Sequence, residues 1–497
     1  MQDWILDSSE NQRIADLLPV ANHTRKIRLS ESTISKIRDN RRKVEEDLLG
    51  SGNTFYGINT GFGILCDKVI NADQLETLQH NLIRSHSCGT GKPADHKVVR
   101  WTILLKIISL AKGHSGVRYE LIEFLIMLLN ENILPEVPEQ GSLGASGDLA
   151  PLSHCSLLCI GEGFLYHNGV RYASADFFRK HKTVLPGLKE KEGLALINGT
   201  QFSLAQLVNC TIEAENLLQT AIVCACASLE AFNGNMDAFD ERIHLLRNQD
   251  GQIWVASCIR GILAGSEIFK RSKNSVQDPY SFRCIPQVIG ASKDAVDYVK
   301  SVAEKEISAV TDNPLIFENG DVLSGGNFHA QSLALATDFL KIALAEVGNI
   351  AERRMYQIII GQRGLPEFLT QEPGVNSGYM IVQYSAASLV SYNKQLATPA
   401  SVDSIVTSKG QEDHVSMATN AGLQCNRIIE HLWEILAMEW MTATRAWCWR
   451  AGWNTSPLLQ KWISRYRSAV ALKIEDHIPS EEYKPTVDFL RDLDFPQ

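Results

Sequence analysis

Three consecutive residues, Ala145-Ser146-Gly147, can build an electrophile from the protein backbone itself. If the amide nitrogen of Gly147 attacks the carbonyl carbon of Ala145 and two waters leave, one of them with the Ser146 hydroxyl oxygen, a five-membered ring forms, 4-methylidene-imidazole-5-one (MIO). The former β-carbon of Ser146 is then open to attack by an amine. Three glycines within seven residues let the backbone reach the tight geometry that cyclisation needs. The alternative is an ordinary loop that leads into a helix near Asp148 and Pro151.

A tyrosine and a histidine lie in two other segments that can contribute to a site. Tyr56 opens a glycine-rich stretch that ends at Gly63, and a tyrosine on a mobile loop can close over a substrate as an acid or a base. The alternative for this stretch is a simple turn. His86 stands in the run Arg84-Ser85-His86-Ser87, and a lone histidine can equally be a structural residue.

An arginine that suits a carboxylate occurs further along, in the run that begins at Gln277. Arg283 offers a planar, two-pronged donor that matches the carboxylate of an amino acid. Tyr280 precedes it by three residues, which on a helix places the phenol and the guanidinium on one face. The alternative is a surface salt bridge beside a packed tyrosine.

Acidic and thiol side chains raise the question of a metal site. Glu412 and Asp413 precede His414, but the rest of a metal ligand set is not evident, and a solvated acidic turn explains the run as well. The eleven cysteines form no CxxC pair, and Cys224 and Cys226 lie in apolar surroundings typical of buried structural thiols. We therefore expect no metal and no disulfide framework.

The elements that position these residues are predicted to be mainly helices. Strand signals are few, and one hairpin is expected around His167-Asn168-Gly169. We expect a mixed, loop-rich region at 1–200, which carries the tyrosine loop and the Ala-Ser-Gly loop, and a long-helix core with a C-terminal helical region at 201–497. Apolar periodicity predicts helices at 98–112 and 119–132, one after residue 200 (Leu204, Leu207, Ile212, Leu217, Leu218, Ile222) and one after residue 327 (Leu333, Ala336, Leu340, Ala343, Val347, Ile350).

Composition narrows the classes of partner. The 497 residues are 44% hydrophobic and 21% charged, so the chain can bury a large core. A formal charge of -9 argues against a general nucleic-acid or membrane-surface binder, and small molecules are the expected partners. The first residues lack the basic start and apolar core of a signal peptide, and no stretch of about 18 apolar residues predicts a membrane span. Reduced thiols then favour a cytoplasmic protein.

The fourteen residues from Gly141 to His154 resemble the prosthetic-group motif of the aromatic amino acid ammonia-lyases and aminomutases. The resemblance extends from about Ile27 to Asp413 and beyond, with the motifs in family order. It implies a mainly α fold, the long-helix bundle of the aspartase/fumarase-like superfamily, and a homotetramer with active sites shared among three subunits. It also implies a carbon-nitrogen lyase whose cofactor is MIO, formed autocatalytically, with no external cofactor. The serine-loop pattern of the aspartases and fumarases themselves is not present in this sequence.

The same resemblance assigns roles to individual residues. Asn198 and Tyr280 are expected at the prosthetic group and the reacting centre, and Arg283 at the substrate carboxylate, with Gln277 assisting. The catalytic set implied is Tyr56, Ala145, Ser146, Gly147, Tyr280 and Glu412, and the substrate-binding set is His86, Asn198, Gln277, Arg283, Phe328, Met380 and Gln411.

Two residues bear on the substrate. His86 favours a polar ring, imidazole or phenol, and Glu412 lies in a Gln-Glu-Asp-His-Val-Ser-Met run typical of the histidine branch, where the other branches usually have glutamine. The resemblance therefore implies elimination of ammonia from L-histidine to give trans-urocanate. The run Arg84-Ser85-His86-Ser87 is also similar to tyrosine ammonia-lyases and tyrosine 2,3-aminomutases, which keeps that chemistry open. Whether Glu412 or a tyrosine removes the β-proton is open too.

Overall fold

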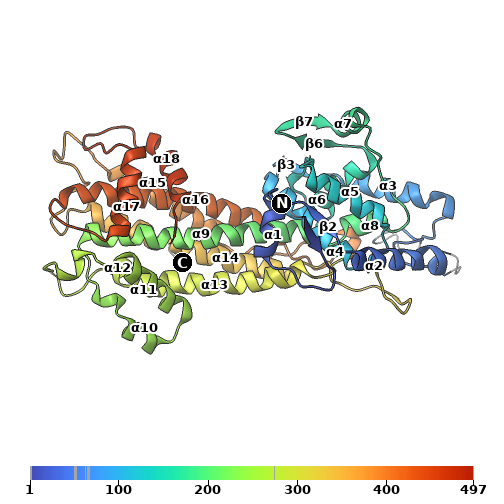
Figure 1. Cartoon of the computed structure of the whole chain (residues 1–497), viewed down its shortest axis with the longest axis horizontal. Coiled ribbons are helices and arrows are strands. Elements are labelled where there is room, and N and C mark those ends of the chain that lie inside the picture. The colour runs from blue at the N-terminus through green and yellow to red at the C-terminus, as the bar shows by residue number, and fades with distance from the viewer. Residues whose placement is uncertain (1–2, 50–52, 62, 64–67, 274, 496–497) are drawn as a thin grey trace. The chain divides into compact units, whose positions relative to one another are not determined.

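The computed structural model describes residues 3–49, 53–61, 63, 68–273 and 275–495 (Figure 1). The chain divides into two compact units, each assembled from three segments. The first unit comprises Met1–Asn209, Lys300–Thr337 and Pro399–Leu423, and the second comprises Cys210–Val299, Asp338–Thr398 and Gln424–Gln497. The first segment ends near the boundary expected at residue 200, while two later segments return to the same unit.

Short helices and very short strands make up the first unit. The helix α4 runs through its core, because almost every residue of His96–Ala111 is buried, including Arg100 and Lys106. Asp95 starts α4 by accepting a hydrogen bond from the backbone N–H of Lys97. The helices are α1 (Ile14–Ala21), α2 (Glu31–Arg42), α3 (Leu75–His86), α4, α5 (Tyr119–Asn130), α6 (Leu149–Ser156), α7 (Ser174–His181) and α8 (Glu192–Ile197).

Three helices of this unit, α3, α6 and α8, pack against one another. The apolar face of α3 is buried through Leu75, Leu82 and Ile83, and the helix ends at His86. All six residues of α8 are buried, and α6 follows directly on the Ala-Ser-Gly loop. The ends of α3 and α8 and the start of α6 are thus close together in the first unit.

The strands form small, separate sheets. The expected hairpin is confirmed, because Phe164–His167 (β6) pairs with Val170–Ala173 (β7) and Asn168 and Gly169 both have positive φ in the turn. The other pairings are β1 (Trp4–Leu6) with β2 (Ile27–Leu29), β3 (Thr90–Pro93) with β5 (Pro138–Gln140), β4 (Leu134–Pro135) with β6, and β8 (Leu315–Ile316) with β9 (Val322–Leu323).

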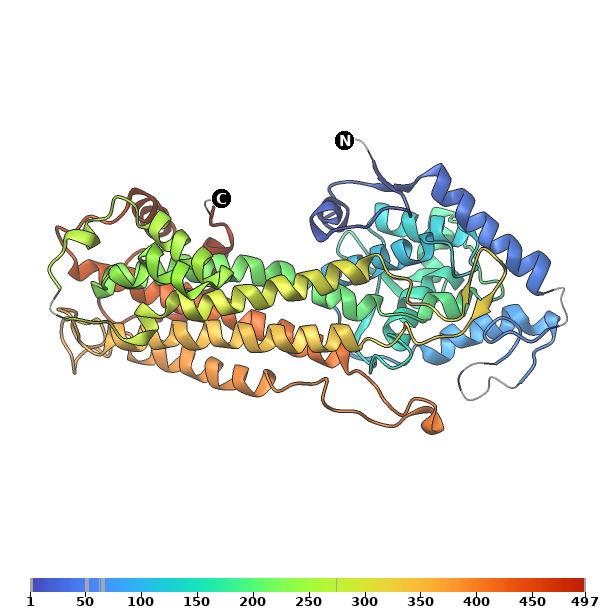
Figure 2. The ribbon, with the colours of Figure 1, turned by 90° about the horizontal axis from the view of Figure 1, so that it is seen from below.

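Long helices lie side by side in the second unit (Figures 1 and 2). Polar contacts join them inside the bundle: Arg354 and Glu439 form a fully buried ion pair, and the hydroxyl of Ser228 donates to Glu439. The long helices are α9 (Gln201–Phe232), α13 (Ile285–Ile307), α14 (Gln331–Ile359) and α16 (Ala418–Ala446), and the shorter ones are α10 (Glu241–Arg247), α11 (Asp250–Ile262), α12 (Tyr280–Arg283), α15 (Met380–Leu396), α17 (Pro457–Ala469) and α18 (Ser480–Arg491).

The mainly helical fold is therefore confirmed. The predicted helices at 98–112 and 119–132 correspond to α4 and α5, and the long helices expected after residues 200 and 327 are α9 and α14. All six seam positions expected on α14 are buried. Cys224 and Cys226 are fully buried, and burial raises the pKa of both thiols. Within the described residues, none of the helices is long and apolar enough to cross a membrane.

Candidate active site

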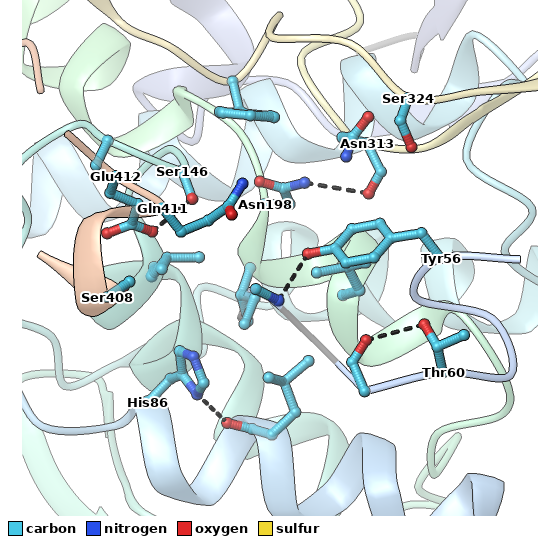
Figure 3. A pocket seen from close by; sticks show the side chains of 18 of the residues that line it. Tyr56, Thr60, His86, Ser146, Asn198, Asn313, Ser324, Ser408, Gln411 and Glu412 are labelled. Atoms are coloured by element: carbon cyan, nitrogen blue, oxygen red, sulfur yellow. Dashed lines mark hydrogen bonds between the residues drawn. The ribbon is translucent and has the colours of Figure 1, made fainter. Parts of the chain in front are cut away.

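One cavity of the first unit, with a volume of about 1180 Å³, gathers most of the residues expected at a site (Figure 3). Its lining comes from loops and helix ends, including the segment around Tyr56, the end of α3, the Ala-Ser-Gly loop, the end of α8 and the loop before α16. Eight of the residues expected in the catalytic or substrate-binding sets line it: Tyr56, His86, Ala145, Ser146, Asn198, Phe328, Gln411 and Glu412.

The Ala-Ser-Gly loop is held in a tight bend by its own neighbours. The Ser142 hydroxyl donates to Asp148 at 2.8 Å and accepts from the backbone N–H of Gly144 at 3.1 Å. Gly144 has a φ of +62°, and a Cβ there would lie 2.3 Å from the hydroxyl oxygen of Ser416. Ser142 and Ser416 thus hold the loop where a larger residue at position 144 would not fit.

Gly147 is locked against Gly199. The two residues form a parallel bridge, and the backbone N–H of Asp148 donates to the Gly199 carbonyl at 2.7 Å. Gly147 has a φ of +78°, and a Cβ on it would lie 2.2 Å from the Gly199 carbonyl oxygen. Only glycine fits this approach, because any side chain would meet backbone atoms that cannot move aside.

The carboxylate of Asp148 organises the base of the loop. It is fully buried and accepts hydrogen bonds from Ser142, from the N–H and the hydroxyl of Ser203, and from the Thr419 hydroxyl. Burial raises the pKa of this carboxyl, and the hydrogen bonds oppose that rise. The expected helix does begin at Leu149, but the Asp148 side chain makes no capping bond to it. Sequence inspection missed this role of Asp148 because its four donor groups come from a preceding residue, Ser142, and from the distant residues Ser203 and Thr419.

Ser146 and Glu412 meet at the cavity surface (Figure 3). The Ser146 hydroxyl donates to Oε1 of Glu412 at 2.7 Å. The Thr407 hydroxyl donates to Oε2 of the same carboxylate at 2.6 Å, and the backbone N–H of Thr407 bonds to the Glu412 carbonyl at 3.0 Å. One donor on each oxygen therefore fixes the carboxylate. Of these two donor residues, Ser146 lines the cavity and Thr407 does not.

Asn198 follows the end of α8 and lines the cavity. Its Nδ2 donates to the backbone carbonyl of Asn313 at 3.1 Å, and its Oδ1 is buried without a hydrogen-bond partner among the described residues. Figure 3 shows the oxygen end of this amide turned away from Asn313. A buried acceptor without a donor is costly, so this atom suits a ligand that carries an N–H or O–H group.

His86 and Tyr56 complete the polar lining. Nδ1 of His86 lies 2.9 Å from the Leu82 carbonyl and 3.0 Å from the Ser85 hydroxyl. A carbonyl only accepts, so this nitrogen carries a proton and the other ring nitrogen is left for a ligand. Burial lowers the pKa of His86, which favours the neutral ring. The Tyr56 hydroxyl accepts from the backbone N–H of Gly63 at 3.1 Å; Phe62 of the predicted Tyr56 loop lies outside the described residues.

Four of the expected residues belong to the second unit, and the cavity lining does not include them. Tyr280 and Arg283 share one face of α12, with the guanidinium carbon 4.8 Å from the ring centroid, as their spacing predicted. Tyr280 is 71% exposed, and Gln277 and Met380 are exposed too. Their roles stay predictions.

The cavity also contains polar residues to which sequence inspection assigned no catalytic or substrate-binding role. Asn313 is one, and the Asn-Pro pair at 313–314 was a signal for a special turn. His329 and His414 stack with their ring centroids 5.4 Å apart and both line the cavity. No group of three or more possible metal ligands occurs among the described histidine, cysteine and acidic residues.

The chain is similar to known proteins over most of its length. A family profile described as aromatic amino acid lyase matches residues 13–468. The histidine ammonia-lyase of Geobacillus sp. (strain WCH70) is 48% identical over 458 residues, which cover 92% of this chain and 90% of that protein. Among solved structures, the histidine ammonia-lyase from Trypanosoma cruzi is 35% identical with a TM-score of 0.90, covering 98% of this chain and 93% of that one. The tyrosine aminomutase from Streptomyces globisporus is 30% identical with a TM-score of 0.93, and each chain is covered completely.

The mainly helical fold is thus shared with a histidine ammonia-lyase and a tyrosine aminomutase of known structure. The chain belongs to the aromatic amino acid lyase family.

Proposed function

We propose that this protein eliminates ammonia from L-histidine to give trans-urocanate, with MIO formed from Ala145-Ser146-Gly147 as its prosthetic group. The observation that carries the proposal is the contact of the Glu412 carboxylate with Ser146, in a cavity that His86 also lines. A carboxylate and an imidazole together suit a polar, N–H-bearing ring. The 48% identity to a histidine ammonia-lyase supports the same substrate.

The residues present fit this prosthetic group. Gly147 has no room for a side chain, Ser142 and Asp148 hold the bend, and the side chain of Ser146 lines the cavity. When formed, MIO would supply an electrophilic carbon that makes the substrate amine a better leaving group.

The chain's own side chains would bind and deprotonate the substrate. The unpartnered Oδ1 of Asn198 can accept a hydrogen bond from the substrate amine. Glu412 can accept from the imidazole N–H or remove the β-proton, and Tyr56 is the other candidate base in this cavity. A carboxylate of the substrate needs a cation, and we assign that role to Arg283, with Gln277 assisting. We assign Tyr280 to the reacting centre and Met380 to substrate binding.

We further propose a homotetramer whose active sites combine residues of several subunits. Large apolar side chains are exposed on two helices of the second unit: Phe339, Ile342 and Tyr356 on α14, and Ile381, Tyr384 and Tyr392 on α15. Exposed apolar stripes of this kind mark surfaces that another chain covers. A cytoplasmic location is part of the proposal, in keeping with the ten free thiols among the described cysteines.

The test is a substrate panel on purified protein. With L-histidine we expect free ammonia and a product that absorbs in the near ultraviolet, and we expect Ser146→Ala to lose at least about 10³-fold in rate while keeping its helical circular dichroism. Faster conversion of L-tyrosine to coumarate, or to β-tyrosine without ammonia, would replace histidine by tyrosine chemistry. Full activity of Ser146→Ala would remove the prosthetic group from the proposal.

A further inference from the structure

In the unmodified chain the Ser146 hydroxyl is hydrogen-bonded to Glu412, a group that can take part in forming the prosthetic group. Oε1 of Glu412 lies 2.7 Å from the Ser146 hydroxyl oxygen, which is the atom that must leave as water. Oε2 is held by the Thr407 hydroxyl at 2.6 Å, so the carboxylate cannot easily turn away. An acid-base group thus touches the leaving oxygen before any substrate is present.

Loss of this oxygen requires a proton at Oγ. The Cα–H bond and the Cβ–Oγ bond of Ser146 break, and a double bond forms between Cα and Cβ. The released Cα proton and the hydroxyl together make one water, so no oxidant, reductant or further reactant is needed. Hydroxide is a poor leaving group, and delivery of the proton to Oγ is the step that a side chain can accelerate.

We propose that Glu412 is a catalytic residue of maturation: its carboxylate takes up the proton that leaves Cα of Ser146 and delivers it to Oγ, which departs as water. This rests on the proposal that Ala145-Ser146-Gly147 cyclises. The other carboxylate at the loop, Asp148, is fully buried, and it accepts its hydrogen bonds from Ser142, Ser203 and Thr419 rather than from Ser146. Glu412 therefore has two successive tasks, because departure of the Ser146 oxygen also frees Oε1 for the substrate.

The test follows the intact mass of the full chain at intervals after cell-free synthesis. Wild type should become lighter by about 36 Da, the mass of two waters. We expect Glu412→Gln to lose the Ser146 oxygen about 10²-fold more slowly, because an amide cannot carry the proton. Chains of this variant should be lighter by at most about 18 Da and should not add a thiol, since their Ser146 hydroxyl is still present.

Two further variants serve as a charge control and as a second test of the carboxylate. Asp413→Asn removes the same charge one residue along, at an exposed position outside the cavity lining, and should mature like wild type. Thr407→Val keeps the carboxylate but removes the hydroxyl that holds Oε2, and should mature more slowly than wild type but faster than Glu412→Gln. If Glu412→Gln fails to fold, the slower maturation of Thr407→Val relative to wild type still tests the role of the carboxylate.

The outcomes separate the two proposals. Loss of two waters by Glu412→Gln at the wild-type rate, or equal slowing in Asp413→Asn, overturns the role of Glu412 in maturation. Absence of the two-water loss in wild type instead overturns the prosthetic group and, with it, the proposed mechanism.

Discussion

The proposed chemistry depends on a few residues whose types leave little choice. Ser146 would supply a β-carbon and a leaving oxygen, and Gly147 would supply an amide nitrogen at a position where no side chain fits. Glu412 and His86 add one carboxylate and one neutral imidazole to the same cavity. Each of these properties belongs to a single residue, so each can be tested by a single substitution.

Gly147→Ala should prevent maturation. Its Cβ would lie 2.2 Å from the Gly199 carbonyl, so the loop must move away from the geometry that cyclisation needs. We expect intact mass to show an unmodified chain and thermal unfolding to show a destabilised one.

Gly169→Ala is the matched control for this prediction. Gly169 has a φ of +76°, close to that of Gly147, but nothing lies within 4 Å of the position its Cβ would take. The Gly169→Ala variant should lose about 1 kcal/mol of folding free energy because alanine disfavours a positive φ, as it would at position 147, but it has no clash. This variant should therefore mature normally. Normal mass loss in Gly147→Ala would contradict the account.

At the scale of elements, a buried lysine ammonium group forms hydrogen bonds to the carbonyls at the end of α8. Nζ of Lys106, on α4, donates to the carbonyls of Ala195 and Asn198 at 3.1 and 2.9 Å. A cation suits the negative end of a helix dipole, and these carbonyls have no further turn of helix to bond. Lys106 thus supports the segment that presents Asn198 to the cavity and Gly199 to Gly147.

Burial lowers the pKa of Lys106 from 10.5 to about 8. Between these two pH values the unfolded chain binds more protons than the folded one, so this residue makes stability rise with pH, by at most about 1.4 kcal/mol per unit. We expect the free energy of unfolding of wild type, minus that of Lys106→Met, to increase from pH 8 to pH 10. Urea titrations at several pH values measure this difference, and a flat or falling difference would refute the prediction.

At the scale of the whole molecule, the expected site residues fall into two groups. Nine belong to the first unit, where all but Gly147 line the cavity, whereas Tyr280, Arg283, Gln277 and Met380 belong to the second. A substrate that needs both groups requires them to meet, and the proposed tetramer supplies a second copy of the chain for this purpose.

Co-expression of two inactive variants tests the shared site. Ser146→Ala lacks the proposed electrophile and Arg283→Ala lacks the proposed carboxylate ligand, and each alone should be nearly inactive. If the two groups come from different subunits, mixed tetramers contain some sites with both groups intact, and activity should return to about a quarter of the wild-type level or less. No recovery in tetramers shown to be mixed would place both groups in one chain.

The sequence alone determined what depends on neighbouring residues. The Ala-Ser-Gly run specified the possible cyclisation, and apolar periodicity located α4, α5, α9 and α14, because a helix face is set by residues three and four positions apart. The 3-residue spacing of Tyr280 and Arg283 predicted their contact for the same reason.

Only the tertiary structure decided which distant groups meet. Ser146 and Glu412 are 266 positions apart, and Asp148 reaches Thr419 across 271. The six residues of α8 are too few for a periodic signal, yet that helix carries Asn198 and Gly199 to the loop. Such contacts depend on how whole helices pack, and no pattern within a local stretch of sequence encodes that packing.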